Sequence, residues 1–319
     1  VAFHKAKRGC DLVWIGVRYV LQPDGVDVTV SDELLDDVSG AIDVMLAANR
    51  ISVTDLRRLA GQANHIAGLV LAWRPSLSDF WGALRKASIV SSGSGQFVWT
   101  RQVYDTLLWL RAFLDHRRGT MIRSYRLRHH FNEAVCLTVA FDAGPRGIGG
   151  ILLLGVVIIA FFSDALSSLD VARFGHALGD CNGQQTWEAL ALLVALRLWR
   201  SHWCSQRFRV VVQGDSMTAL HMLLDIRSKS ETNNLLAREL ALELGAGLYR
   251  PDEIEHIPGL TNTIPDFLSR CMAEKQGEPW PTQLRGVQRD RCPPRDAAWY
   301  LSLVPPRRQS RRKRVREVA

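Results

Sequence analysis

The sequence lacks paired cysteines. Six cysteines are spread singly along 319 residues, and no C-x-x-C pair occurs among them. Zinc sites of the common type and disulfide frameworks are therefore not expected. No cleavable signal precedes the cysteines, so we expect reduced thiols in an intracellular protein, cytoplasmic or nuclear. The cysteines are Cys10, Cys136, Cys181, Cys204, Cys271 and Cys292.

Long hydrophobic runs are also missing. The longest apolar run covers residues 151 to 162, and these twelve residues are interrupted by Gly155. A helix that spans a membrane needs about 18 to 20 apolar residues. The run therefore predicts two buried strands, and no membrane is expected as a partner.

The net positive charge is small outside the end of the chain. The net charge is +8, and residues 307 to 319 carry seven basic residues against one Glu, so they supply +6 of it. The remainder of the chain is only mildly basic. Such a tail is compatible with nucleic-acid binding or a nuclear localisation signal, and equally with a solvated, disordered end.

Residues 1 to 120 have mainly helical patterns. Ser52 followed by Asp55 resembles a capping box, and apolar residues at helical spacing follow until Arg74 and Pro75 end the pattern. The sequence enters this region without an evident start, so we expect that it begins inside a longer parent protein. Further helices are expected at 78–87 and 103–116, and a strand at 13–21.

The character of the sequence changes between residues 120 and 134. Beyond this boundary the predicted order is β-β-β-α-β-α-α-β-α, which describes an α/β domain over 134–275 with a mixed five-stranded sheet and flanking helices. After residue 275 six prolines interrupt any regular pattern. Residues 276–319 are therefore expected to form a linker and a basic, disordered tail.

Four carboxylates occupy the ends of predicted strands or the starts of predicted helices. Asp142 closes the first strand and Asp215 closes the fourth, while Glu188 lies one turn into a helix and Asp266 opens the last helix. Positions of this kind can converge at one edge of a sheet. Carboxylate oxygens are the ligands that magnesium prefers, together with waters and substrate phosphates.

This set of residues suits phosphodiester hydrolysis. Two metal ions about 3.5 to 4 Å apart can activate a water and stabilise the leaving oxygen. Four carboxylates in one pocket would repel one another without cations, and this repulsion would raise some of their pKa values. The sequence therefore predicts a site that is complete only with metal.

Four motifs in order resemble the ribonuclease H domain of retroelement reverse transcriptases, over roughly residues 134–275. They are FDAGPRGIGGILL, TWEALALLVAL, VVVQGDSMTAL and HIPGLTNTIPDFLSR. The resemblance implies a ribonuclease H-like fold and an endonuclease that hydrolyses the RNA strand of RNA/DNA hybrids. It also implies two Mg²⁺ or Mn²⁺ ions, held by Asp142, Glu188, Asp215 and Asp266.

The resemblance implies roles for four further residues. His256 precedes Asp266 by ten residues, the family's spacing for a histidine that assists product release or proton transfer, although a packing role is the alternative. Gln184 and Gln185 occupy positions where the family contacts the minor groove, in which RNA displays its 2′-hydroxyls. Arg146 in the first turn is a candidate phosphate contact.

Residues 1–120 resemble, less specifically, the end of a reverse transcriptase palm followed by its thumb or connection region. VWIGVRYVL is similar to the strand motif beyond the polymerase site, and LRRLAGQANHIAGLVLAWRPSL to the helix leading into the connection. The aromatic-x-Asp-Asp palm signature is absent, and Asp36 and Asp37 are interpreted as helix surface. No polymerase activity is therefore expected, and the upstream palm and fingers of a parent polyprotein are the expected partner.

Two other classes of protein are alternatives to the nuclease. One is a catalytically inactive nucleic-acid-binding or scaffold fragment, but the sequence retains all four carboxylates. The other is a transposase or integrase of the same broad fold, in which the order is Asp, Asp and a late Glu. The order here is Asp, Glu, Asp, Asp, so the sequence favours the ribonuclease H activity.

Overall fold

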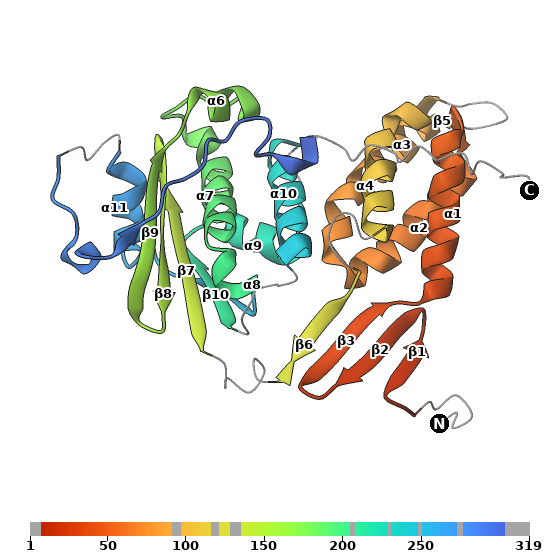
Figure 1. The fold of residues 1–319 in the computed structure, drawn as a ribbon. Coiled ribbons are helices and arrows are strands. Elements are labelled where there is room, and N and C mark those ends of the chain that lie inside the picture. The colour runs from red at the N-terminus through yellow and green to blue at the C-terminus, as the bar shows by residue number, and fades with distance from the viewer. Residues whose placement is uncertain are drawn as a thin grey trace, which may run out of the picture.

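The structure is a computed structural model, and it describes residues 8–90, 97–115, 121–127, 135–204, 208–228, 231–247, 251–272 and 277–303. Two units lie side by side, an N-terminal one in red to yellow and a second one in green to blue (Figure 1). No described helix is long and apolar enough to cross a membrane.

The N-terminal unit contains a four-stranded antiparallel sheet in the order β1-β2-β3-β6. The region is mainly helical, as expected, but it also contains this sheet, of which only the first part was predicted. β3 alternates valines with polar residues, and β6 comes from a segment about a hundred residues later in the chain, so its pairing is not visible locally. The strands are β1 (Asp11–Trp14), β2 (Val17–Gln22), β3 (Gly25–Val30) and β6 (Arg123–Arg126).

Four helices pack beside this sheet around a core of their own. The predicted start of the second helix is confirmed, since the Ser52 hydroxyl accepts a hydrogen bond from the Asp55 N–H at 3.0 Å. Asp36 and Asp37 are exposed on the first helix, as interpreted from the sequence. The elements are α1 (Asp32–Ala47), β4 (Arg50–Ser52), α2 (Val53–Leu69), η2 (Leu71–Trp73), α3 (Arg74–Val90), β5 (Phe97–Trp99), η3 (Thr100–Gln102) and α4 (Tyr104–Leu114), with β4 and β5 forming a small separate sheet.

The second unit has the predicted order of strands and longer helices, together with two short helices, α6 and α8, that were not predicted. β7, β8 and β9 form an antiparallel meander, while β10 runs parallel to β7 and β11 parallel to β10. The expected mixed α/β fold with flanking helices is confirmed in this arrangement. The elements are β7 (Cys136–Ala143), β8 (Gly147–Leu154), β9 (Val157–Ala165), α6 (Ser168–Phe174), η4 (Cys181–Gly183), α7 (Gln184–Leu198), α8 (Ser201–Cys204), β10 (Arg209–Gly214), α9 (Met217–Asp225), α10 (Glu231–Gly247), β11 (Glu253–His256) and α11 (Thr263–Arg270).

Helices cover both faces of this sheet. α7, α9 and α10 lie on one side and α11 lies on the other (Figure 1). Successive residues of a strand point to opposite faces. Accordingly, Val139 and Phe141 belong to the core beneath α7, whereas Ala140 belongs to the smaller core that contains Leu268 of α11. Asp142 therefore points to the α11 side.

The segment after α11 differs from the expected linker. β12 (Gln288–Arg289) pairs in parallel with β9, which gives the sheet six strands in the order β11-β10-β7-β8-β9-β12. η5 (Thr282–Leu284) and η6 (Leu301–Leu303) flank this strand. A two-residue strand among prolines leaves no periodic signal in the sequence. The basic tail over 307–319 lies outside the described residues.

Helix α10 joins the two units. Arg238 of α10 forms an ion pair with Asp79 of α3 at 2.7 Å. Leu242, also on α10, is buried in the hydrophobic core of the N-terminal unit. A second contact joins α3 and α9, where Arg74 donates a hydrogen bond to the backbone oxygen of Asp225 at 3.1 Å. The two units are thus held by apolar and charged contacts.

Candidate active site

The predicted catalytic residues lie at one edge of the second sheet. β7 and β10 are parallel neighbours, so Asp142 near the end of β7 and Asp215 just after β10 leave the sheet at the same edge. β11 is parallel to β10 and pairs His256 with Gly214. The register of three strands therefore places both aspartates and His256 at this edge.

Asp142 is buried and bonded to α11. Its side chain is 6% exposed, and its Oδ2 accepts a hydrogen bond from the Ser269 hydroxyl at 2.8 Å. The pKa of this carboxyl is raised to about 7, chiefly by burial. The hydrogen bond from Ser269 lowers it, and the nearby carboxylates of Asp215 and Asp266 contribute to the rise. An acid in such surroundings favours its neutral form unless a cation compensates the charge.

Asp215 lies beneath the loop that leads to α11. A Cβ atom at Gly259 would lie 3.0 Å from Asp215 Oδ2, so the loop backbone passes close to this carboxylate. The loop is tied to the sheet at Asn262, whose amide donates to the Phe141 carbonyl at 3.0 Å. Glycine at position 259 thus permits the close approach.

Glu188 is held on α7 by two polar neighbours. The Gln184 amide donates to Glu188 Oε1 at 3.3 Å and also to the Ala143 carbonyl at the end of β7. Burial raises the pKa of Glu188, hydrogen bonds from Ser216 and Gln184 lower it, and the charge of Asp215 raises it. The first helical turn of α7 is in this way fastened to the same sheet edge.

Asp266 completes the set from α11, which covers the face of the sheet opposite to α7. It lies in the first turn of α11 and forms an ion pair with Arg270 at 2.7 Å, four residues later. Ser269 Oγ lies within hydrogen-bond distance of both Asp142 Oδ2 and the Asp266 carbonyl oxygen, so the first turn of α11 lies beside Asp142.

The four carboxylates are thus held near the same edge of the sheet, by the register of β7 and β10 and by the contacts of Gln184 and Ser269. Asp142 responds to Asp215 and Asp266, and Glu188 responds to Asp215. In the described part of the chain, however, no three His, Cys, Asp or Glu side chains form a cluster that could hold a metal ion by themselves. Mg²⁺ is usually bound through one or two carboxylates, with waters and substrate phosphates completing its shell. The all-oxygen donor set fits that mode of binding.

Of the other predicted site residues, three are exposed and one, Gln184, is hydrogen-bonded within the protein. His256, Gln185 and Arg146 are exposed, so they are available to a ligand. Gln184 is partly buried, and its amide already serves Glu188 and Ala143. Its proposed contact with a minor groove stays a prediction.

Three polar residues of the site were missed in the sequence. Ser269 bonds Asp142, Asn262 anchors the loop, and Ser216 bonds Glu188. Ser216 directly follows Asp215, and Ser269 follows Asp266 by three residues, which places it on the same side of a helix. Helical spacing from the predicted ligand was therefore the signal that could have identified Ser269.

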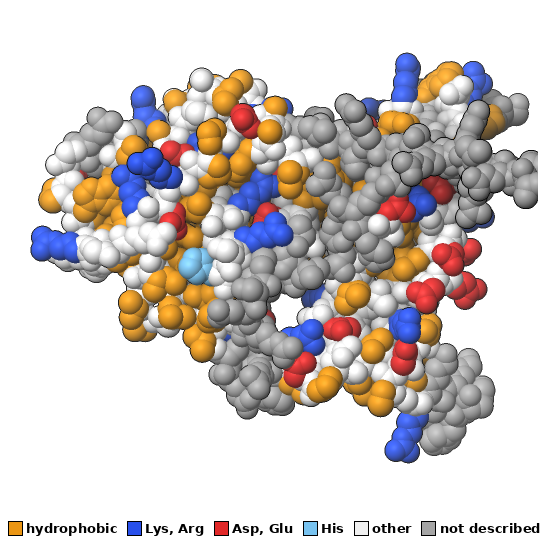
Figure 2. Space-filling view, in the orientation of Figure 1, with side chains coloured by type: hydrophobic (Ala, Val, Ile, Leu, Met, Phe, Trp, Pro, Cys, Tyr) orange, Lys and Arg blue, Asp and Glu red, His pale blue; other side chains and the backbone are white. Residues whose placement is uncertain are grey.

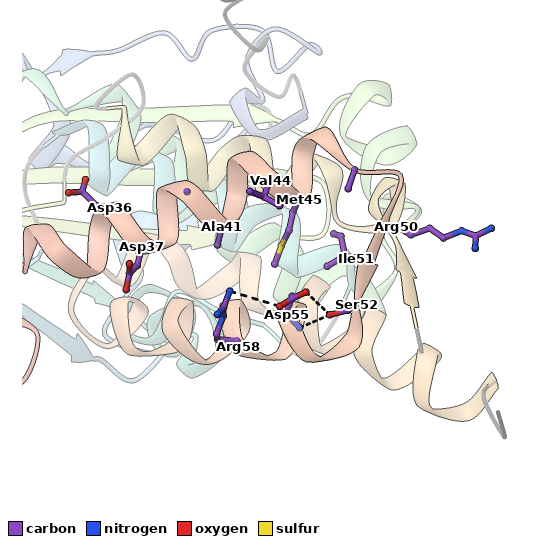
Figure 3. A pocket seen from close by; sticks show the side chains of 12 residues that line it. Asp36, Asp37, Ala41, Val44, Met45, Arg50, Ile51, Ser52, Asp55 and Arg58 are labelled. Atoms are coloured by element: carbon purple, nitrogen blue, oxygen red, sulfur yellow. Dashed lines mark hydrogen bonds and ion pairs between the residues drawn. The ribbon is translucent and has the colours of Figure 1, made fainter. Parts of the chain in front are cut away.

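A separate cavity of about 420 Å³ lies in the N-terminal unit between α1 and the start of α2 (Figure 3). It is lined by Asp36, Asp37 and Asp55, by Arg50 and Arg58, and by apolar residues of α1. Acidic side chains also gather over α1 on the surface (Figure 2). This cavity contains none of the four carboxylates of the sheet edge, so it is not part of the candidate active site.

Comparison with known proteins finds no matching family model and no matching curated protein. Among solved structures, ribonuclease H1 from the halophilic archaeon Halobacterium salinarum NRC-1 is 22% identical, with a TM-score of 0.33, over 44% of this chain and 98% of that one. The N-terminal ribonuclease H domain of Rv2228c from Mycobacterium tuberculosis is 18% identical, with a TM-score of 0.31, over 42% and 95%. The foamy viral protease-reverse transcriptase in complex with an RNA/DNA hybrid is 14% identical, with a TM-score of 0.28, over 79% of this chain and 30% of that one. These solved neighbours are ribonuclease H domains and a reverse transcriptase.

Proposed function

We propose that this chain is a metal-dependent endonuclease that hydrolyses the RNA strand of RNA/DNA hybrids. The observation that carries the proposal is the placement of Asp142, Glu188, Asp215 and Asp266 at one edge of the sheet. They are contributed by β7, by α7, by the residue just after β10 and by α11. These are the residues and the order that the resemblance to ribonuclease H implies.

Each residue of the group has a role in this proposal. The four carboxylates hold two Mg²⁺ or Mn²⁺ ions, which when bound supply an activated water and stabilise the leaving oxygen. Burial of Asp142 keeps bulk water from screening its charge. His256 is exposed at the end of β11, which pairs with β10, and it moves a proton or assists product release. Gln185 and Arg146 contact the hybrid.

The N-terminal unit fits a non-catalytic role within the same proposal. We infer that it is the thumb or connection part of a retrotransposon reverse transcriptase polyprotein, whose palm and fingers lie upstream and which acts in the cytoplasm or nucleus. Its acidic pair Asp36 and Asp37 is exposed on α1 rather than placed on a strand hairpin, which supports the proposal that this unit is not a polymerase.

The test is cleavage of a hybrid labelled on its RNA strand by the full chain. We expect cleavage with Mg²⁺ or Mn²⁺, none in excess chelator, and a loss of several orders of magnitude in Asp142→Asn, because that variant removes a metal-binding charge. Glu253→Gln is the matched control, since Glu253 is exposed at the other end of β11. Equal cleavage in chelator, or wild-type rates in Asp142→Asn, would contradict the proposal. Hybrid binding without any cleavage would favour the inactive scaffold fragment.

A further inference from the structure

The glycines of β8 allow α11 to lie unusually close to the sheet. A Cβ atom at Gly149 would lie 2.5 Å from the Leu268 Cβ, and one at Gly147 would lie 2.4 Å from the Ser269 carbonyl oxygen. Side chains at these two positions would therefore push the helix away. The close approach brings the end of α11 within hydrogen-bond distance of β7.

Two buried serines use this proximity in different ways. Ser269 is 1% exposed and donates to Asp142 Oδ2 at 2.8 Å. Ser163 of β9 is 6% exposed and donates to the Leu268 carbonyl at 2.6 Å. Both fasten α11 to the sheet, but only Ser269 does so through a carboxylate of the candidate active site.

The Ser269 hydroxyl has a second acceptor within reach. The Asp266 carbonyl lies 2.9 Å from Ser269 Oγ, and a hydroxyl has a single proton to donate. A bond to an ionised carboxylate is about twice as strong as one between neutral groups. The proton therefore goes to Asp142 whenever that group is charged.

We propose that Ser269 is a positioning residue that fixes the Asp142 carboxylate toward α11 and so links the strand bearing the first aspartate to the helix bearing the last. The terminal torsion of an aspartate is broad and nearly two-fold, so without such a partner its oxygens are not held in one orientation. The inference rests on the proposed function, because Asp142 is taken as a metal ligand. Residues that hold a metal ligand in place typically contribute 10- to 100-fold to metal affinity or activity.

The experiment compares Ser269→Ala with Ser163→Ala in the full chain by calorimetric titration with Mn²⁺. We expect Mn²⁺ affinity about 10-fold lower in Ser269→Ala, unchanged affinity in Ser163→Ala, and recovery in Ser269→Thr, which keeps the hydroxyl. Thermal unfolding checks that each variant is folded. If Ser269→Ala does not fold, Ser269→Cys is used in its place, because cysteine is close to serine in size.

The outcomes separate this inference from the proposed function. Unchanged Mn²⁺ affinity in Ser269→Ala would overturn the inference. An equal loss of affinity in Ser269→Ala and Ser163→Ala would also overturn it, because it would mean that α11 had loosened generally. No Mn²⁺ binding by the wild-type chain would overturn both ideas. Ser269-dependent Mn²⁺ binding in a chain that does not cleave hybrids would support the inference and contradict the nuclease.

Discussion

Asp142 has two properties that disfavour its charged form when no cation is near. Its carboxyl is almost fully buried, and two further carboxylates act on it across the sheet edge. Both effects penalise the charged form, and the hydrogen bond from Ser269 compensates only in part. A metal ion would reverse the balance, because an opposite charge nearby favours ionisation.

This balance predicts a pH-dependent stability in the presence of chelator. The pKa of Asp142 is about 7 in the folded chain against 3.8 for the ordinary group. Between these values the folded state holds a proton that the unfolded state has lost, so stability falls as the pH rises from about 4 to about 7. From pH 5 to pH 8 we expect a loss of roughly 3 kcal/mol that is missing in Asp142→Asn.

Urea unfolding of both proteins at the two pH values measures this difference. Glu188, whose pKa is also raised, is present in both proteins and cancels in the comparison. Parallel pH profiles for wild type and Asp142→Asn would show that Asp142 ionises normally in the folded chain.

At the scale of elements, the contact between α11 and the strands beneath it decides whether the site assembles. Asp266 is carried by this helix, and its distance from Asp142 depends on how closely the helix packs on β8. Gly149 has the larger number of close atoms in that contact, because backbone as well as side-chain atoms of Leu268 lie within 3.0 Å of a Cβ built there.

Gly149→Ala should therefore destabilise the chain and reduce cleavage together. Overpacking of this kind costs about 1 to 3 kcal/mol, and the displaced helix would carry Asp266 away from Asp142. Gly61→Ala on α2 is the matched control, because a Cβ atom there meets nothing within 4 Å and alanine favours a helix. Thermal unfolding and hybrid cleavage test both variants. Normal stability and cleavage in Gly149→Ala would mean that the helix is not held by this contact.

At the scale of the whole molecule, the last described segment binds the second unit together. Trp199, which directly follows α7, donates to Asp290 at 2.9 Å, and Tyr300 is buried in the core beneath α7. Arg295 is 5% exposed and bonds both Asp164 and the fully buried Asp170 of α6. Residues 277–303 thus connect β9, α6 and α7, which are distant from them in the sequence.

Arg295→Ala should show how much this segment contributes. Removing one partner of a buried ion pair leaves the other charge uncompensated and costs on the order of 3 to 5 kcal/mol. The exposed Arg291→Ala serves as the control, with little change expected. Chemical unfolding measures both. A loss no greater in Arg295→Ala than in Arg291→Ala would mean that the segment is a linker after all.

The order of elements from 134 to 275 and the four candidate ligands were determined by the sequence itself. Periodicity, glycine turns and strand ends are local, so they predict the strands β7 to β11, the helices α7, α9, α10 and α11, and the places of Asp142, Glu188, Asp215 and Asp266 along them. The start of α2 at Ser52 is equally local, because a capping side chain bonds a backbone N–H three residues away.

Other features were decided only by the tertiary structure. β6 pairs with β3 across about a hundred residues, and β12 adds itself to β9 from a proline-rich stretch without a pattern. Ser269 reaches Asp142 only because the glycines of β8 admit α11 so closely. These contacts join parts of the chain that are far apart in the sequence, and their energies depend on the packed fold, so no local pattern records them.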